Sequence, residues 1–121
     1  MARILFVDDD PDTLETMTRA VQIFGHQAVI ASNGQEALSK AASTQLDLIF
    51  IDMRLPDISG DELISQLNEL ESMKGVPICM LTASVEHETE NLAKAAGASE
   101  YLNKPVRLQK LIEIIRQYTE P

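Results

Sequence analysis

Two hydrophobic patterns alternate along the chain. Short runs that fit strands of a buried parallel sheet lie at residues 3–7, 27–31, 48–51, 76–81 and 100–103. Segments whose apolar residues recur every three or four positions, as on one face of a helix, lie at about 11–24, 37–43, 60–71, 88–96 and from 108 onward. The pattern therefore predicts five strands that alternate with five helices.

Regular alternation of this kind is typical of an α/β fold. We predict a single (βα)5 doubly wound parallel sheet with five helices on its two faces. The 121 residues are enough for one domain, 1–121, with one core. The run at 27–31 begins with a polar residue, which favours an edge strand. Gly25 and Gly97 are predicted to end helices, and Asn33-Gly34 to form a turn.

The central stretch of the sequence holds a carboxylate at a strand end. Residues 48–51 are an unbroken apolar run that is too short for a helix, and Asp52 ends it. The next residues cannot continue a central strand, because Pro56 lacks an N–H and Gly60 marks a turn. We therefore expect Asp52 at the mouth of a buried strand.

Composition narrows the class of protein. The formal net charge is −9, which argues against direct nucleic-acid binding because phosphate contacts require Lys and Arg. No apolar run approaches the roughly 20 residues of a membrane span, and the N-terminus does not resemble a signal peptide. The one cysteine, Cys79, lies in an apolar run and is expected in the core. We expect a cytoplasmic protein.

Polar residues collect where the predicted strands end. Asp8 and Asp9 follow the first strand, Asp52 the third, Thr82 the fourth and Lys104 the fifth. Ligands of open α/β sheets bind beyond the carboxyl ends of the strands. If these strands are neighbours, three carboxylates, one hydroxyl and one ammonium face a single crevice.

Three carboxylates at that spacing would be unstable alone. Two unit charges about 4 Å apart repel by about 4 kcal/mol at an effective dielectric of 20. Either one carboxyl has a raised pKa, or a hard divalent cation lies among the oxygens. Mg²⁺ fits better than Ca²⁺, because it needs only one or two carboxylates and keeps water ligands.

Other polar residues have simpler interpretations. Asp10 before Pro11 is a natural N-cap, and Asp12 suits the positive end of the helix dipole. Capping leaves Asp8 and Asp9 unexplained. His26 and His87 lack the spacing of a metal site or a catalytic dyad, and we predict that both lie on the surface.

Over essentially its whole length, the sequence resembles a response-regulator receiver domain of two-component signalling, similar to the chemotaxis regulators. The matching features are Val7-Asp8-Asp9, Asp52 after Ile-Phe-Ile, Leu55-Pro56, Gly60, Leu81-Thr82-Ala83, Ala96-Gly97-Ala98, Tyr101 and Lys104-Pro105. Their order and spacing together are highly specific. The resemblance implies a flavodoxin-like sheet of strand order 2-1-3-4-5.

The resemblance also implies a phosphoryl-transfer site. Asp52 would be the nucleophile that takes a phosphoryl group from a sensor histidine kinase or a histidine phosphotransfer protein. Asp9, Asp52 and the backbone carbonyl of Arg54 would hold Mg²⁺, and Asp8 would act mainly through a metal-bound water. Lys104 would neutralise one phosphoryl oxygen. The chain would be no enzyme beyond its own phosphorylation and dephosphorylation.

A switch is implied by the same resemblance. Thr82 would hydrogen-bond a phosphoryl oxygen, and Tyr101 would turn inward as Thr82 moves, changing the surface of the fourth helix, fifth strand and fifth helix. Lys104-Pro105 is a candidate cis peptide bond. Arg54 and Ser84 occupy positions that tune the lifetime of the phosphorylated state in the family. The last helix lacks a clear dimerisation charge pattern, so a monomer is favoured.

Three alternatives compete with this interpretation. A haloacid-dehalogenase-like phosphatase also uses an aspartate after the first strand, but the Thr of its motif is misplaced here. A pseudo-receiver that only binds partners would usually lack an acid, the Thr or the Lys. A flavodoxin-like redox protein would need a flavin-phosphate loop after the first strand, where the four acids Asp8, Asp9, Asp10 and Asp12 would repel the phosphate. The receiver interpretation does not identify the downstream effector. It is compatible with a stand-alone receiver and with a receiver that is part of a longer regulator or hybrid kinase.

Overall fold

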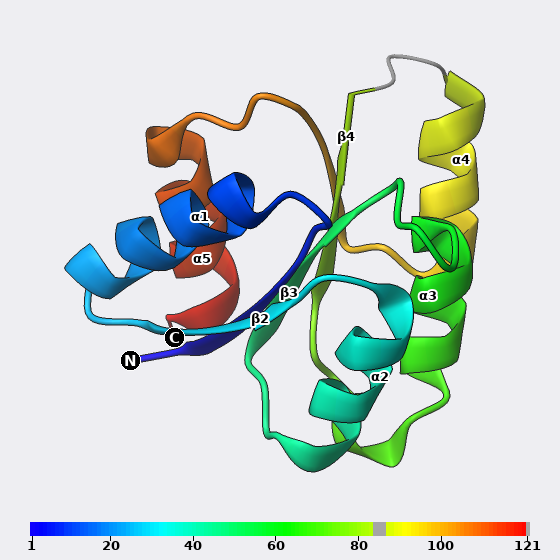
Figure 1. The fold of residues 1–121 in the computed structure, drawn as a ribbon, viewed down its shortest axis with the longest axis horizontal. Helices are drawn as coiled ribbons and strands as arrows, with labels where there is room; N and C mark the ends of the chain where they lie inside the picture. Colours follow the sequence, from blue (N-terminus) through cyan, green and yellow to red (C-terminus); the bar gives the residue numbers. More distant parts are fainter. Residues whose placement is uncertain (84–86, 121) are drawn as a thin grey trace.

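A computed structural model describes residues 1–83 and 87–120. The elements are β1 (Arg3–Val7), α1 (Pro11–Ile23), β2 (Gln27–Ala31), α2 (Gly34–Ser43), β3 (Leu48–Asp52), α3 (Gly60–Asn68), a 3₁₀ turn (Glu71–Met73), β4 (Ile78–Thr82), α4 (His87–Ala96), β5 (Glu100–Asn103) and α5 (Leu108–Thr119) (Figure 1). The strands and helices alternate in the predicted order. No helix in the described ranges is long and apolar enough to cross a bilayer.

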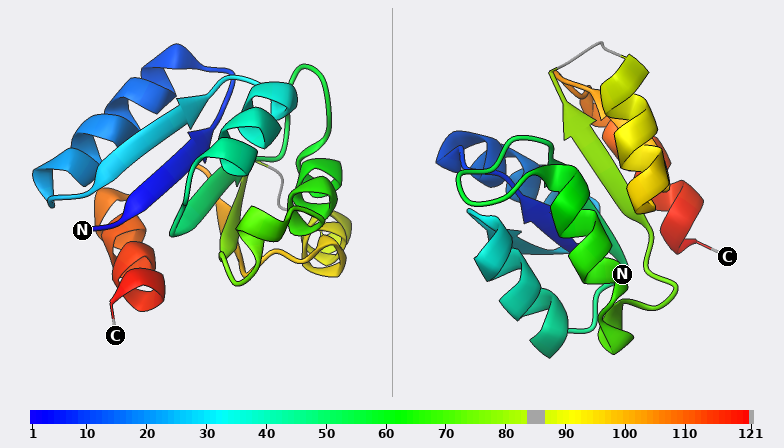
Figure 2. Two further views of the ribbon diagram at one scale, coloured as in Figure 1. Left: turned by 90° about the horizontal axis from the view of Figure 1, so that it is seen from below. Right: turned by 90° about the vertical axis from the view of Figure 1, so that its right-hand side faces the viewer.

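The sheet has the predicted topology. Its strand order is β2-β1-β3-β4-β5, and every neighbouring pair is parallel. Helices α1 and α5 cover one face, and α2, α3 and α4 cover the other, as the views in Figures 1 and 2 show. The strand 27–31 lies at an edge, as its polar start predicted. This is the flavodoxin-like, doubly wound arrangement.

Each face of the sheet has its own apolar core. Alternate residues of a strand point to opposite faces, so β1 contributes Ile4 and Phe6 to the α1/α5 side and Leu5 and Val7 to the other side. On the α1/α5 side the rings of Phe6 and Phe50 stack with centroids 5.3 Å apart. The double burial of β1 and β3 holds their carboxyl ends rigidly in place.

Several predicted boundaries were wrong by a few residues. Helix α3 ends at Asn68 and is followed by the separate 3₁₀ turn, and β4 begins at Ile78 because Pro77 lacks an N–H. Asn33-Gly34 is the start of α2 rather than a turn, since the Asn33 side chain accepts from the Glu36 N–H. Gly25 and Gly97 end their helices with positive φ, as predicted.

Candidate functional site: an acidic cluster at the carboxyl end of the sheet

Backbone pairing brings the predicted site residues to one edge of the sheet. Asp52 lies opposite Leu81, and Thr82 lies opposite Asn103. The N–H of Asp8 donates to the Ala31 carbonyl, and the N–H of Lys104 donates to the Thr82 carbonyl at 2.7 Å. Residues that are up to 96 positions apart in sequence therefore meet because four parallel strands end together.

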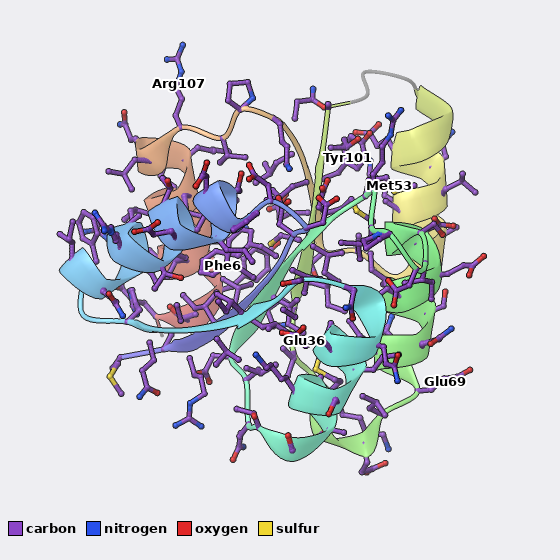
Figure 3. All side chains as sticks on the ribbon, in the orientation of Figure 1. Phe6, Glu36, Met53, Glu69, Tyr101 and Arg107 are labelled. Atoms are coloured by element: carbon purple, nitrogen blue, oxygen red, sulfur yellow. The ribbon has the colours of Figure 1, made fainter. Side chains whose placement is uncertain are left out.

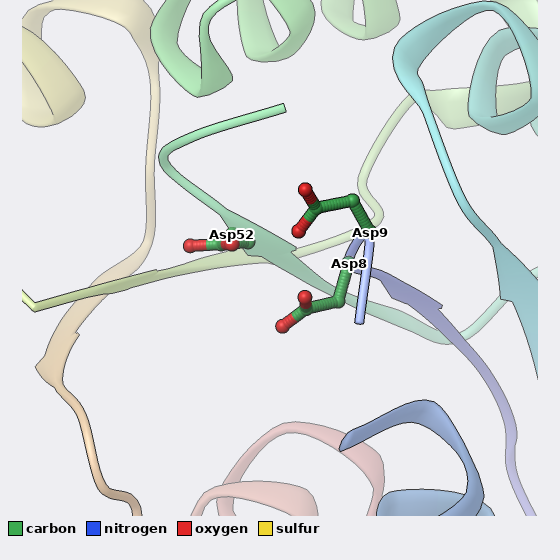
Figure 4. A group of neighbouring side chains, drawn as sticks. All are labelled: Asp8, Asp9 and Asp52. Carbon is green, nitrogen blue, oxygen red and sulfur yellow. The ribbon is translucent and has the colours of Figure 1, made fainter. Parts of the chain in front are cut away.

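Three carboxylates form the centre of the site. One oxygen from each of Asp8, Asp9 and Asp52 lies within 4.8 Å of the other two, and Figure 4 shows the three side chains around a common space. Asp8 is buried and Asp9 is exposed, while 13% of the Asp52 side chain is accessible. The cluster opens to solvent on the Asp9 side.

Lys104 reaches into this cluster from the end of β5. Its Nζ lies 2.8 Å from Oδ2 of Asp8 and 3.4 Å from Oδ2 of Asp52. The other oxygen of Asp8 accepts from the Asp10 N–H at 3.0 Å. One ammonium therefore serves two carboxylates, and the Asp8 carboxylate is held from both sides.

The charges of the cluster are only partly balanced. Burial raises the pKa of the Asp52 carboxyl, the charge of Lys104 lowers it and the charge of Asp8 raises it, so that the net shift is upward. Burial lowers the pKa of Lys104, but its hydrogen bond to Asp8 and the charges of Asp52 and Asp8 raise it more. Both alternatives for relieving the repulsion thus have a physical basis here: a raised pKa on Asp52 and a site for a cation.

The donor set fits a hard divalent cation. All three side chains offer carboxylate oxygens, and one of them, Asp9, is accessible to solvent. Oxygen ligands in an open site that keeps water suit Mg²⁺.

The remaining predicted site residues surround this centre. Thr82 is buried at the end of β4. Tyr101 is partly buried on β5 and packs against the core on the α2/α3/α4 side, where Figure 3 shows it on the same side as Met53. The Lys104–Pro105 peptide bond is cis, as predicted. Ser84 lies outside the described residues.

Acids outside the cluster have the capping roles that the sequence indicated. The Asp10 side chain accepts from the Asp12 N–H at 3.2 Å and from the Thr13 hydroxyl at 2.7 Å, and Pro11 occupies the first turn. These bonds, led by that of Thr13, lower the pKa of Asp10. Cys79 is buried as predicted, and burial raises the pKa of its thiol to about 12.

His26 is partly exposed, which agrees in part with the predicted surface position, and its Nδ1 accepts from the Ala2 N–H at 3.0 Å. The His87 side chain lies outside the described part of the structure.

Sequence reasoning missed one residue near the site. Asp57, in the loop after β3, accepts from the N–H groups of Gly34 at 2.8 Å and Gln35 at 3.0 Å. Its partners lie 22 and 23 residues away, so no local pattern could have identified it. The only signal in the sequence was that Asp57 is an acid directly after Pro56, in a predicted loop.

Comparison with known proteins supports the same class. Residues 4–116 match the family model of the response regulator receiver domain. The chain is 30% identical to protein PilH of Pseudomonas aeruginosa over 95% of each sequence. It is 32% identical to transcriptional regulatory protein PrrA of Mycobacterium leprae over 94% of this chain, but it spans only 48% of PrrA.

Solved structures agree with this family match. Chemotaxis protein CheY4 of Vibrio cholerae superimposes with a TM-score of 0.92 at 30% identity, over 98% of both chains. The receiver domain of sensor histidine kinase PA1611 of Pseudomonas aeruginosa, solved with a magnesium ion in its active site cleft, superimposes with a TM-score of 0.89 at 26% identity, over 97% of this chain and 96% of that one.

The chain belongs to the response-regulator receiver family of two-component signalling. Because the chain belongs to this family, the haloacid-dehalogenase-like phosphatase and the flavodoxin-like redox protein are no longer needed as explanations of the sequence. The pseudo-receiver alternative lies within the family.

Proposed function

We propose that this receiver accepts a phosphoryl group on Asp52 in a Mg²⁺-dependent reaction. The observation that carries the proposal is the convergence of Asp8, Asp9 and Asp52 on one space, with Lys104 already within 3.4 Å of Asp52. A pseudo-receiver would have no need to keep three mutually repelling carboxylates and a cation together at one edge of its sheet.

The proposed step is an in-line displacement at phosphorus. An oxygen of Asp52 forms a bond to phosphorus as the phosphorus–nitrogen bond of the donor phosphohistidine breaks, and the electron pair stays on the imidazole. The reaction calls for orientation and charge neutralisation more than for covalent assistance. Asp9, Asp52 and the Arg54 carbonyl would hold Mg²⁺, with Asp8 acting mainly through a water, and the bound ion supplies positive charge near the phosphoryl oxygens.

The chain's own cation has two tasks in this scheme. Lys104 favours the ionised form of Asp52 before transfer and forms an ion pair with the buried Asp8 carboxylate, because its Nζ lies close to both. After transfer it would pair with a phosphoryl oxygen, as the Asp52 charge is then carried by the phosphoryl group. The contact of Lys104 with Asp52 is longer than its contact with Asp8. We infer that Lys104 gives up the Asp52 contact, and keeps the Asp8 contact, when it pairs with the phosphoryl oxygen.

The proposed output is a change of the α4–β5–α5 surface. The Thr82 hydroxyl would donate a hydrogen bond to a phosphoryl oxygen. As Thr82 moves toward that oxygen, the Tyr101 side chain would turn inward. Both residues lie on neighbouring strands, since β4 pairs with β5. A change at Asp52 would therefore reach the outer surface within two strands.

Partners follow from the family. We propose a sensor histidine kinase or a histidine phosphotransfer protein as donor, a cytoplasmic location, a monomeric receiver domain and no direct contact with nucleic acid. The homologues include proteins of about the same length, such as PilH, and longer ones, such as PrrA. The donor and the downstream effector would be proteins, and beyond its own phosphorylation and dephosphorylation the chain would catalyse no reaction.

Intact-mass measurement with acetyl phosphate and Mg²⁺ tests the proposal. We expect the wild type, and not Asp52→Asn, to gain one phosphoryl group that is labile to hydroxylamine and lost when Mg²⁺ is chelated. Modification of neither protein would favour a pseudo-receiver. Equal modification of both would show that Asp52 is the wrong nucleophile.

A further inference from the structure

The loop after β3 is closed at its base. The Gly60 N–H donates to the Met53 carbonyl at 2.8 Å, and Arg54 and Ser59 form an isolated antiparallel bridge. The Met53 N–H donates to the Leu81 carbonyl, which continues the β3–β4 pairing one residue past Asp52. Residues 53–60 therefore form a small hairpin whose tip, residues 55–58, projects beyond the sheet.

Asp57 fastens this tip to α2. Its two carboxylate oxygens accept separately, one from the N–H of Gly34 and the other from the N–H of Gln35. The next N–H of the helix, that of Glu36, is satisfied by the Asn33 side chain. Asp57 therefore supplies the acceptors for two of the first N–H groups of α2, which have no partner within the helix.

Packing shows how closely the tip approaches α2. A Cβ at Gly34 would lie 2.2 Å from Cγ2 of Ile58 and 3.3 Å from an Asp57 oxygen. At the base of the loop, a Cβ at Gly60 would lie 2.9 Å from the Met53 Cα and from the Met80 Cε. The absence of a side chain at Gly34 lets the tip of the loop lie against α2, and its absence at Gly60 lets the base of the loop close.

Arg54 connects this loop to the phosphoacceptor. The backbone N–H of Arg54 acts on the Asp52 carboxylate and lowers the pKa of Asp52 against the effect of burial. Arg54 lies between the point at which Met53 is fixed to β4 and the tip that Asp57 fixes to α2. Loss of the Asp57 bonds would leave the tip held only by the apolar packing of Leu55 and Ile58 against the core.

We propose that Asp57 is a positioning residue for the site, because its bonds to α2 hold the hairpin that carries Arg54. The held hairpin keeps the Arg54 N–H close to the Asp52 carboxylate and keeps the Arg54 carbonyl available to the cation. The inference rests on the proposed function, since that function assigns the Arg54 carbonyl to Mg²⁺. It adds a residue that touches neither the cation nor the phosphoryl group.

Calorimetric titration with MgCl₂ alone, without a phosphodonor, is the first test. We expect Asp57→Ala to weaken Mg²⁺ binding about threefold to tenfold, somewhat less than the 10–100-fold typical of groups that directly orient metal ligands. Asp57→Asn keeps one carbonyl acceptor and should recover part of the affinity. Glu69→Ala removes an exposed charge from the far end of α3 and should bind like the wild type.

Amide hydrogen exchange separates this role from simple helix capping. In Asp57→Ala we expect faster exchange at Gly34 and Gln35 together with weaker Mg²⁺ binding. Faster exchange with unchanged Mg²⁺ affinity would overturn the proposal, because Asp57 would then only cap α2. A wild type that neither binds Mg²⁺ nor takes a phosphoryl group would contradict the proposed function itself, which makes the two failures distinguishable.

Discussion

Aspartates of this protein occupy two kinds of site with opposite electrostatics. In the cluster, Asp52 is largely buried beside Asp8, and its pKa is raised, first by burial. At the starts of α1 and α2, the exposed carboxylates of Asp10 and Asp57 accept hydrogen bonds that lower the pKa of each. At the carboxyl end of the sheet, burial disfavours the ionised carboxylate of Asp52. At the helix starts, hydrogen bonds favour the ionised carboxylates of Asp10 and Asp57.

Under the proposed function, this difference separates carboxylates that serve the fold from those that serve chemistry. A capping aspartate needs only an oxygen acceptor, and an asparagine can supply one. Under the proposed function a cluster aspartate is needed for its charge, because a carboxylate attracts a divalent cation more strongly than a neutral amide does and attacks phosphorus as an anion. Replacing Asp by Asn at each position is therefore a direct way to tell the two groups apart.

The largest predicted effect concerns the exposed member of the cluster. We expect Asp9→Asn to weaken Mg²⁺ binding by at least about tenfold, because a charged ligand is lost while the fold is untouched. Asp12→Asn, which changes an exposed acid in the first turn of α1, is the matched control and should bind Mg²⁺ normally. Calorimetry of both variants checks this, and equal affinities would remove Asp9 from the cation site.

An effect of similar size, on stability, should follow from removing the ammonium of Lys104. In the absence of Mg²⁺, Lys104→Met leaves the buried Asp8 carboxylate without its ion pair, and we expect a loss of about 1–3 kcal/mol in the free energy of unfolding. Lys110→Met breaks only an exposed pair with Glu113 and should cost less than about 1 kcal/mol. Urea denaturation of the two variants would contradict the account if their losses were equal.

The pH dependence of stability should differ between the two groups of acids. The folded pKa of Asp52 is raised, so its contribution is present below its unfolded pKa of about 3.9 and is lost as the pH rises through the folded value. With Mg²⁺ removed by a chelator, Asp52→Asn should therefore have the same free energy of unfolding as the wild type at about pH 3. Towards pH 7 the variant should become the more stable protein.

Urea denaturation across this range checks the sign. Added Mg²⁺ should remove the advantage of the variant by stabilising the wild type in proportion to its binding. A variant that is less stable than the wild type at pH 7 in chelator would show that Lys104 outweighs the burial of Asp52. Asp10 and Asp57 should show the opposite sign, since their folded pKa values are lowered and their contributions are lost as the pH falls below about 4.

The smallest effect is expected at the α1 cap. Asp10→Asn should lower the midpoint of thermal unfolding only slightly, because the amide oxygen can still accept from the Asp12 N–H while the charge favoured by the Thr13 hydroxyl is lost. Asp10→Ala should lower it by a few degrees. Scanning calorimetry of the pair checks this. A drop in the asparagine variant as large as that in the alanine variant would mean that the Asp10 charge matters more than its acceptor oxygen, and the division between the two groups would fail there.

The sequence predicted the fold and the members of the cluster because both depend on short-range patterns. Residues 48–51 are apolar on both faces, so they had to form a buried strand, and Asp52 had to follow it. Parallel strands bring Asp8, Asp52 and Lys104 together once the strand order is known, and that order came from the resemblance to receiver domains. The prediction of Asp10 as a cap succeeded because an N-cap is decided within three or four residues.

Features that depend on distant contacts were not predictable. Asp57 gained its role only when the β3–α3 loop came to lie against Gly34. The interpretation of Asn33-Gly34 as a turn failed because a turn and a helix start use the same residues, and the Asn33 bond to Glu36 decides between them. The pairing of Lys104 with Asp8 more closely than with Asp52 likewise depends on side-chain geometry.

The most direct test of the account is to locate the phosphoryl group chemically. Wild-type protein is treated with acetyl phosphate and Mg²⁺, the acyl phosphate is reduced with borohydride to convert the modified aspartate to homoserine, and peptides are sequenced by mass spectrometry. We predict homoserine at position 52 alone. Homoserine at position 8, 9 or 57 instead would contradict the assignment of Asp52 as the phosphoacceptor.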